Sequence, residues 1–334
     1  MKKRTMLTVY SAAHFFVDFC CAFGMFSIVK PQGNWLYALL FYNFCAFALQ
    51  MPAGIAADRL RCNRAFAVSG CMIVFCGLLI GDPLICAVVL GIGNALFHVG
   101  GGRSVLVSFN KCAPLGIFVS PGALGLYFGT VAGKADGAFK LACLAVMVIC
   151  AVLIFVMCKN EEVVQTEEKH EKNTGLLIAA CVCLFAVVCI RSFAGMNFSF
   201  PWKTGALSFM ATAAAVAGKT LGGVFYDKAG GKLTAVISLA LSAVFLLFFE
   251  NPFFGIVGVL LFNFTMPITL FELAQRLPEK KGFAFGMLTF ALFIGFLPTL
   301  FGTDSLSGIS SCAMAVISLA LLAPFVGGKK NDIG

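Results

Sequence analysis

Gly54-Ile-Ala-Ala-Asp58-Arg59-Leu-Arg61 ends one apolar stretch of the chain, and Gly223-Val-Phe-Tyr-Asp227-Lys228-Ala-Gly230 ends another. The two segments lie 169 positions apart in a chain of 334 residues, which is close to half its length. The same offset aligns Asn94 with Asn263 and Arg103 with Glu272. An internal repeat at half-length in an apolar chain is typical of membrane transporters built from two similar bundles.

The composition excludes an ordinary soluble protein. Hydrophobic residues make up 60% of the chain, charged residues 12%, and the mean hydropathy is +0.97. The net charge of +9 resides in short segments between apolar stretches, so we expect it to set membrane orientation and expect no nucleic-acid partner. Most of the 15 cysteines lie inside apolar stretches and none forms a Cys-x-x-Cys pair, so we expect no metal site, no disulfide framework and no cofactor.

Cutting the sequence at charges, Pro and Gly predicts twelve membrane spans, six on each side of a polar segment. The expected spans are 6–29, 34–57, 65–80, 84–108, 115–133, 138–158, 175–197, 205–226, 233–249, 252–272, 282–303 and 307–327. The spans 65–80 and 233–249 are short. We interpret the start of the chain as an uncleaved first span and not as a signal peptide, because no small-residue cleavage site follows it.

The positive charges test this count. With the N-terminus inside, alternate loops place 18 of the 24 Lys and Arg residues on the cytoplasmic side and four outside. We therefore expect both termini in the cytoplasm. The expected domains are an N-terminal six-helix bundle at 1–158, a solvated linker at 159–174 and a C-terminal six-helix bundle at 175–334.

Six plus six spans with Gly-x-x-x-Asp-Arg/Lys after spans 2 and 8 resemble the major facilitator superfamily. The resemblance implies that Gly54, Asp58 and Arg59, and likewise Gly223, Asp227 and Lys228, close a cytoplasmic gate. The physical argument agrees: Gly permits close helix approach, Asp can cap or pair with cations, and the following cation holds the turn at the lipid surface. The first copy departs from the family pattern at Arg61, where a second Gly is usual.

A narrower resemblance rests on motifs in spans 1, 4, 5, 7 and 10. They are similar to those of the fosmidomycin-resistance group of this superfamily, which are inner-membrane exporters of small, often anionic, drugs or metabolites. The motifs are His14-Phe-Phe-Val-Asp18, Gly93-Asn94-Ala-Leu-Phe97-His98, Phe118-Val-Ser-Pro-Gly122, Arg191-Ser192, and Pro267 through Gly282. The resemblance implies drug efflux across a bacterial inner membrane.

Ionisable residues inside a span are costly and require a reason. His14 and Asp18 are four residues apart and share one helix face, so they form either a proton carrier or a satisfied polar pair that fixes packing. His98 lies one turn from Asn94 on span 4. It is either a substrate or proton site, or a histidine bonded to a neighbouring helix carbonyl.

The cationic residues inside spans suggest an anionic or zwitterionic substrate. Arg191 is the best candidate for an anion ligand, with snorkelling to the interface as the alternative. Lys219 lies within reach of the cytoplasmic face and is a second candidate, together with Asn94, His98 and Asn263. Arg103 either snorkels or bridges to its repeat partner Glu272, but Glu272 and Arg276 are also spaced to form a local pair.

Glycines at 122, 125, 129 and 133 leave one face of span 5 bare, which predicts close packing against a neighbouring helix. Together these observations predict a monomeric, all-α secondary transporter and not an enzyme, with a small molecule, protons and lipid as its partners. We expect proton-coupled export, with proton-coupled uptake as the alternative. A membrane enzyme or sensor is disfavoured because the sequence shows neither a catalytic cluster nor a large soluble domain. The sequence also lacks a phosphate-binding loop, so we do not expect ATP to be the energy source.

Overall fold

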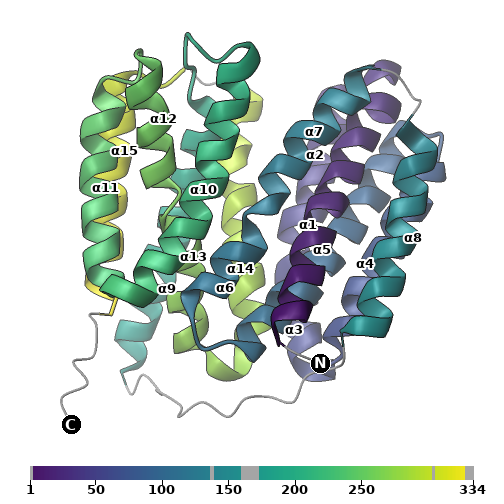
Figure 1. Ribbon diagram of the computed structural model, residues 1–334, viewed down its shortest axis with the longest axis horizontal. Helices are drawn as coiled ribbons and strands as arrows, with labels where there is room; N and C mark the ends of the chain where they lie inside the picture. Colours follow the sequence, from purple (N-terminus) through teal and green to yellow (C-terminus); the bar gives the residue numbers. More distant parts are fainter. Residues whose placement is uncertain (1–2, 136–138, 159–172, 303–304, 328–334) are drawn as a thin grey trace. The chain divides into compact units, whose positions relative to one another are not determined.

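The computed structural model describes residues 3–135, 139–158, 173–302 and 305–327, and within these ranges all regular secondary structure is helical (Figure 1). Ten helical segments are long and apolar enough to cross a membrane. Two shorter apolar helices, Asn63–Leu79 and Gly231–Leu247, correspond to the two short spans expected from the sequence. The predicted all-α membrane fold is therefore confirmed, with helix ends within a few residues of those expected.

The chain divides into two compact units. Unit 1 comprises residues 1–110, 118–166 and 279–293, and unit 2 comprises 111–117, 167–278 and 294–334. The predicted linker at 159–174 lies almost wholly outside the described residues, so the predicted domain boundaries stay a prediction.

Unit 1 is built mainly from the first half of the sequence. Its helices are α1 (Lys3–Gly24), α2 (Trp35–Asn43), α3 (Gln50–Leu60), α4 (Asn63–Leu79), α5 (Pro83–Ser108), α7 (Pro121–Ala135), α8 (Lys140–Met157) and most of α14 (Lys281–Phe296). Two short π-helical turns, Met25–Val29 and Phe44–Ala48, extend α1 and join α2 to α3. Helix α1 packs against α5, α7 and α8, and α4 packs against α5 and α8 (Figure 1).

Unit 2 contains most of α6 (Cys112–Val119) and the later helices. These are α9 (Thr174–Asn197), α10 (Gly205–Ala229), α11 (Gly231–Leu247), α12 (Pro252–Phe262), α13 (Thr265–Arg276) and α15 (Gly308–Leu322). Helix α11 packs against α12 and α15, and α10 packs against α12 and α13.

The repeat seen in the sequence extends to the helix caps. Asp82 precedes Pro83 at the start of α5, and its Oδ1 accepts hydrogen bonds from Leu84 N at 3.0 Å and Ile85 N at 2.8 Å. Asn251, 169 positions later, precedes Pro252, and its Oδ1 accepts from Phe253 N at 3.0 Å. An Asp or Asn cap followed by Pro is a strong helix start, because it satisfies otherwise unpaired N–H groups.

The bare face of α7 packs against α1, as the glycine spacing predicted. A Cβ atom at Gly125, Gly129 or Gly133 would overlap or crowd the backbone carbonyl of Phe15, Phe19 or Phe23, respectively. A larger residue at these positions would therefore force the two helices apart. The close approach brings α7 against the polar residues of α1.

Candidate functional site

A polar pair lies buried on α1. His14 is 5% exposed and Asp18 is 7% exposed. His14 Nε2 lies 3.3 Å from Asp18 Oδ2, as expected for residues one helical turn apart. Neither group reaches water easily, so their charge must be balanced locally.

Helix α5 completes the cluster. Asn94 Nδ2 donates to Asp18 Oδ1 at 2.8 Å, and His98 Nε2 lies 2.8 Å from His14 Nε2 and 3.6 Å from Asp18 Oδ1. Asn94 and His98 are both buried. We call these four residues, His14, Asp18, Asn94 and His98, the histidine cluster.

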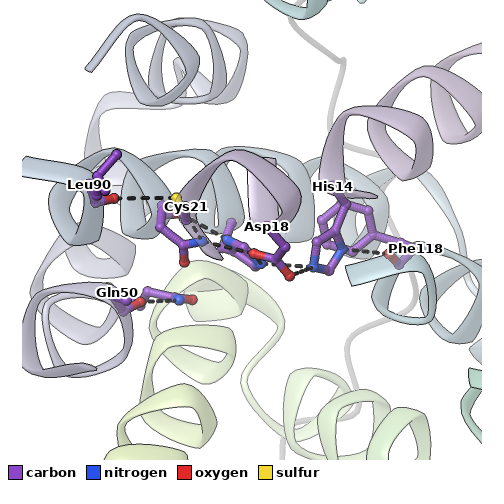
Figure 2. Close-up of polar contacts among 9 residues, drawn as sticks. His14, Asp18, Cys21, Gln50, Leu90 and Phe118 are labelled. Carbon is purple, nitrogen blue, oxygen red and sulfur yellow. Dashed lines mark hydrogen bonds and ion pairs between the residues drawn. The ribbon is translucent and has the colours of Figure 1, made fainter. Parts of the chain in front are cut away.

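Helices α6 and α7 supply the third wall of the cluster. The helix is interrupted between Val119 and Pro121, because proline has no N–H to continue the helical hydrogen bonds. At this break the Phe118 carbonyl accepts a hydrogen bond from His14 Nδ1 at 2.7 Å (Figure 2). A Cβ atom at Gly122 would overlap His14 Nε2 and Asp18 Oδ2, so only glycine leaves room for the cluster.

The sequence gives no reason to expect a metal, but the structure brings three potential ligands together. The ligand atoms of His14, Asp18 and His98 lie within 4.8 Å of one another. Sequence reasoning missed this grouping, because His98 meets His14 only through the packing of α5 on α1.

Two further buried polar residues, Cys21 beside the cluster and Gln50 on α3, were not predicted. The Cys21 thiol donates to the Leu90 carbonyl at 3.7 Å and lies 3.8 Å from Asn94 Nδ2 (Figure 2). Gln50 is fully buried; its Nε2 donates to the Ala46 carbonyl at 2.6 Å, and its Oε1 has no partner among the described residues. A polar residue that interrupts an otherwise apolar span was the available signal for Gln50.

The first copy of the repeated turn places Asp58 at the start of α14. Asp58 Oδ1 accepts from Gly282 N at 2.9 Å, and Oδ2 accepts from Phe283 N at 2.8 Å. A Cβ atom at Gly54 would overlap the Gly282 carbonyl, which explains why glycine precedes the aspartate by one turn. The carboxylate satisfies N–H groups of the first helical turn and lies at the positive end of the helix dipole.

The second copy makes the same contact inside unit 2. Asp227 Oδ1 accepts from Cys112 N at 2.8 Å, and Oδ2 accepts from Ala113 N at 2.9 Å, both at the start of α6. A Cβ atom at Gly223 would lie 2.7 Å from the Cys112 carbonyl oxygen. Asp58 and Asp227 therefore both cap the start of a helix, which is one of the two roles, capping or pairing with cations, that the sequence suggested. Arg59 and Lys228, the cations that follow, are exposed.

Arg103 distinguishes the first copy. Its Nε donates to Asp58 Oδ1 at 2.7 Å and its Nη1 donates to Asn63 Oδ1 at 2.8 Å. Arg103 is 6% exposed, so it does not snorkel to solvent. Its partner in the structure is Asp58.

For Glu272 the structure has the local pair. Arg276 Nη1 donates to Glu272 Oε2 at 2.6 Å, and Glu272 Oε1 accepts from the Tyr226 hydroxyl at 2.6 Å and from Gly327 N at 2.9 Å. Arg276 Nη2 also donates to the Phe325 carbonyl at 2.5 Å. Glu272 thereby ties α13 to α10 and to the end of the last helical segment.

The cationic candidates of unit 2 differ in environment. Arg191, on α9, is 8% exposed, and its Nη1 has no hydrogen-bond partner among the described residues. Lys219, on α10, is half-buried. Asn263, between α12 and α13, donates to the Val259 carbonyl of the preceding turn at 2.8 Å. Arg191 therefore keeps one buried donor, Nη1, without an acceptor among the described residues.

Neither a protein-family model nor a curated protein matches the sequence. The structure is similar to that of a variant of the Escherichia coli fucose:proton symporter FucP, with a TM-score of 0.66 at 10% identity, over 96% of this chain and 98% of that chain. It is also similar to the major facilitator superfamily transporter FucP in the outward conformation, with a TM-score of 0.64 at 11% identity, over 96% and 97% of the two chains. Both are transporters and not enzymes. The chain is therefore a multi-pass, all-α membrane protein with the fold of major facilitator superfamily transporters.

Proposed function

We propose that this protein is a secondary active transporter that couples proton movement to the export of a small anionic or amphipathic compound by alternating access. The observation that carries the proposal is the buried histidine cluster. An ionisable residue inside a span costs at least about 2.5 kcal/mol on insertion scales, and this cluster collects three of them. Its His14, Asp18 and His98 are the proposed proton-coupling residues.

Arg191 is the proposed anion ligand. A guanidinium cannot lose its charge at ordinary pH, so its buried Nη1 needs an acceptor. A carboxylate, phosphate or phosphonate of the substrate supplies one with matching geometry. Lys219 and Asn263 of unit 2 are further proposed substrate-binding residues. Asn94 and His98 of the histidine cluster are also proposed to bind substrate.

The two repeated turns are the proposed gate. Asp58 and Asp227 hold the starts of α14 and α6 through backbone hydrogen bonds, which release when these helices move. Gly54 and Gly223 allow the close approach, and Arg59 and Lys228 hold the turns at the lipid surface. Arg103 and Glu272 add buried ion pairs at equivalent positions of the repeat.

Export follows from the resemblance of the sequence motifs to the fosmidomycin-resistance group, which also implies drug resistance and a bacterial inner membrane. The excess of positive charge in alternate loops of the sequence supports a cytoplasmic location for both termini. Uptake by proton symport is the second candidate, because one of the similar solved structures is described as that of a fucose:proton symporter.

Purified protein in proteoliposomes tests the proposal with an imposed pH gradient and labelled small organic anions. An antiporter accumulates substrate in vesicles with an acidic lumen, and a symporter accumulates it in vesicles with an alkaline lumen. A protonophore should abolish either accumulation. Uptake that is equal under both gradients and without a gradient would refute proton coupling. A thermal-shift screen over carboxylates, phosphates and phosphonates would identify substrates for this assay.

A further inference from the structure

The two imidazoles of the histidine cluster have fixed proton positions on one side. His14 Nδ1 lies 2.7 Å from the Phe118 carbonyl oxygen, and His98 Nδ1 lies 2.8 Å from the Asn94 carbonyl oxygen. A carbonyl oxygen only accepts, so both Nδ1 atoms must carry a proton. If both rings were neutral, each Nε2 would then present a lone pair.

These two Nε2 atoms face each other at 2.8 Å. Two lone pairs at this distance repel, whereas one proton between them makes a strong hydrogen bond with a charged donor. The two imidazoles together therefore require one proton more than two neutral rings carry. Its positive charge is balanced by Asp18, whose two oxygens lie 3.3 Å from His14 Nε2 and 3.6 Å from His98 Nε2.

The surrounding groups agree with an ionised Asp18. Asn94 donates to its Oδ1 at 2.8 Å. Two further titratable groups lie close enough to interact with Asp18, the Cys21 thiol on α1 and the Tyr42 phenol on α2, and both are ordinarily neutral. The α7 side of the cluster contributes Gly122, which has no charge. With one shared proton and an ionised carboxylate, the cluster is neutral overall.

The separation of the rings also argues against a metal ion between them. Zinc binds each imidazole nitrogen at about 2.0–2.1 Å, which places two nitrogens of a tetrahedral site about 3.3 Å apart. The observed 2.8 Å is a hydrogen-bond distance. The cation that fits the rings as they stand is a proton.

We propose that the coupled proton is held between His14 Nε2 and His98 Nε2, and that Asp18 stays ionised as its counter-ion. This inference rests on the proposed proton-coupled function and specifies where the proton binds. Loss of the proton leaves two opposed lone pairs and an unbalanced buried carboxylate, so release must separate the rings. Because His14 is on α1 and His98 on α5, proton occupancy controls how closely these two helices pack.

Nuclear magnetic resonance on the full-length protein tests this assignment directly. The chain has three histidines, and the third, His170, lies outside the described residues, so a His170→Gln variant isolates the two ring systems. With ¹⁵N-labelled His and ¹³C-labelled Asp, we expect one proton to leave the paired Nε2 atoms as pH rises. The Asp18 carboxyl signal, identified by its loss in Asp18→Asn, should remain in the ionised range throughout. Titration of the Asp18 carboxyl without a change at the rings would overturn the proposal.

Transport by His98→Gln provides a second test. The Gln amide can donate to a neutral His14 Nε2, so the variant pairs the helices without an extra proton. We expect gradient-driven accumulation by this variant to fall at least about tenfold relative to the parent. His170→Gln is the matched control and should behave as the parent.

Full gradient-driven accumulation by His98→Gln would overturn the inference. One equivalent of zinc held by the purified protein and lost in His98→Gln would also overturn it. Failure of the proposed function looks different, because the unsubstituted protein would then show no gradient-driven transport at all.

Discussion

Replacing Asp58 by Asn should destabilise the protein more than the equivalent replacement of Asp227. Both carboxylates accept two backbone N–H groups, so each substitution leaves one N–H group poorly satisfied, at about 1–2 kcal/mol. Asp58 additionally pairs with Arg103 at 2.7 Å. The Asp227→Asn variant is therefore a matched control for the capping contribution alone.

The ion pair sets the size of the difference. The side chains of Arg103 and Asp58 are 7% and 9% exposed, so solvent does not screen their interaction. Removing one partner of a buried pair costs about 3–5 kcal/mol, and the retained bond from Arg103 to Asn63 reduces this loss. We expect Asp58→Asn to be about 2–3 kcal/mol less stable than Asp227→Asn, which lowers its melting temperature by roughly 5 °C more.

Thermal unfolding of the purified variants in one detergent measures the difference. The double variant Asp58→Asn, Arg103→Met removes the orphaned charge, so its melting temperature should rise back toward that of Asp227→Asn. Equal losses for the two single variants, or no recovery in the double variant, would show that the Arg103–Asp58 pair contributes nothing to stability.

Three further substitutions test other parts of the structure. Arg61 has a φ of +52°, and its repeat partner Gly230 has a φ of +91°. The Arg61→Gly substitution should therefore relieve about 1 kcal/mol of backbone strain and leave the melting temperature unchanged or slightly higher. A clear decrease in melting temperature would show that Arg61 is not strained. Gly122→Ala places a methyl group in the histidine cluster and should reduce gradient-driven transport at least about tenfold. Gly195→Ala is the control, because a Cβ atom there has no neighbour within 4 Å, and it should leave transport unchanged. Equal transport by the two variants would show that the cluster takes no part in coupling. Arg191→Lys should weaken binding of an anionic substrate by about tenfold or more in a thermal-shift titration, because a single ammonium group cannot make the paired hydrogen bonds of a guanidinium. Unchanged affinity would exclude Arg191 as the anion ligand.

Features that depend on residues close together in the sequence, and the internal repeat, could be predicted from the sequence alone. Each apolar stretch had to be long enough to cross a bilayer, so the helices occur within a few residues of their expected positions. The 169-residue repeat predicted matching turns, and both turns make the same contact. The pairing of His14 with Asp18 followed from their spacing of one helical turn.

The sequence determined which residues are costly to bury, and tertiary structure decided what they are buried against. Asp58 reaches N–H groups 224 and 225 positions away, and His14 reaches a carbonyl 104 positions away. These partners are backbone groups that every residue type carries except for the N–H of proline, so residue identity does not mark them. His98 contacts His14, and Arg103 contacts Asp58, only because helix packing places turns that are distant in the sequence next to each other. Local chemistry is therefore readable from the sequence, whereas the choice among distant partners is made by packing.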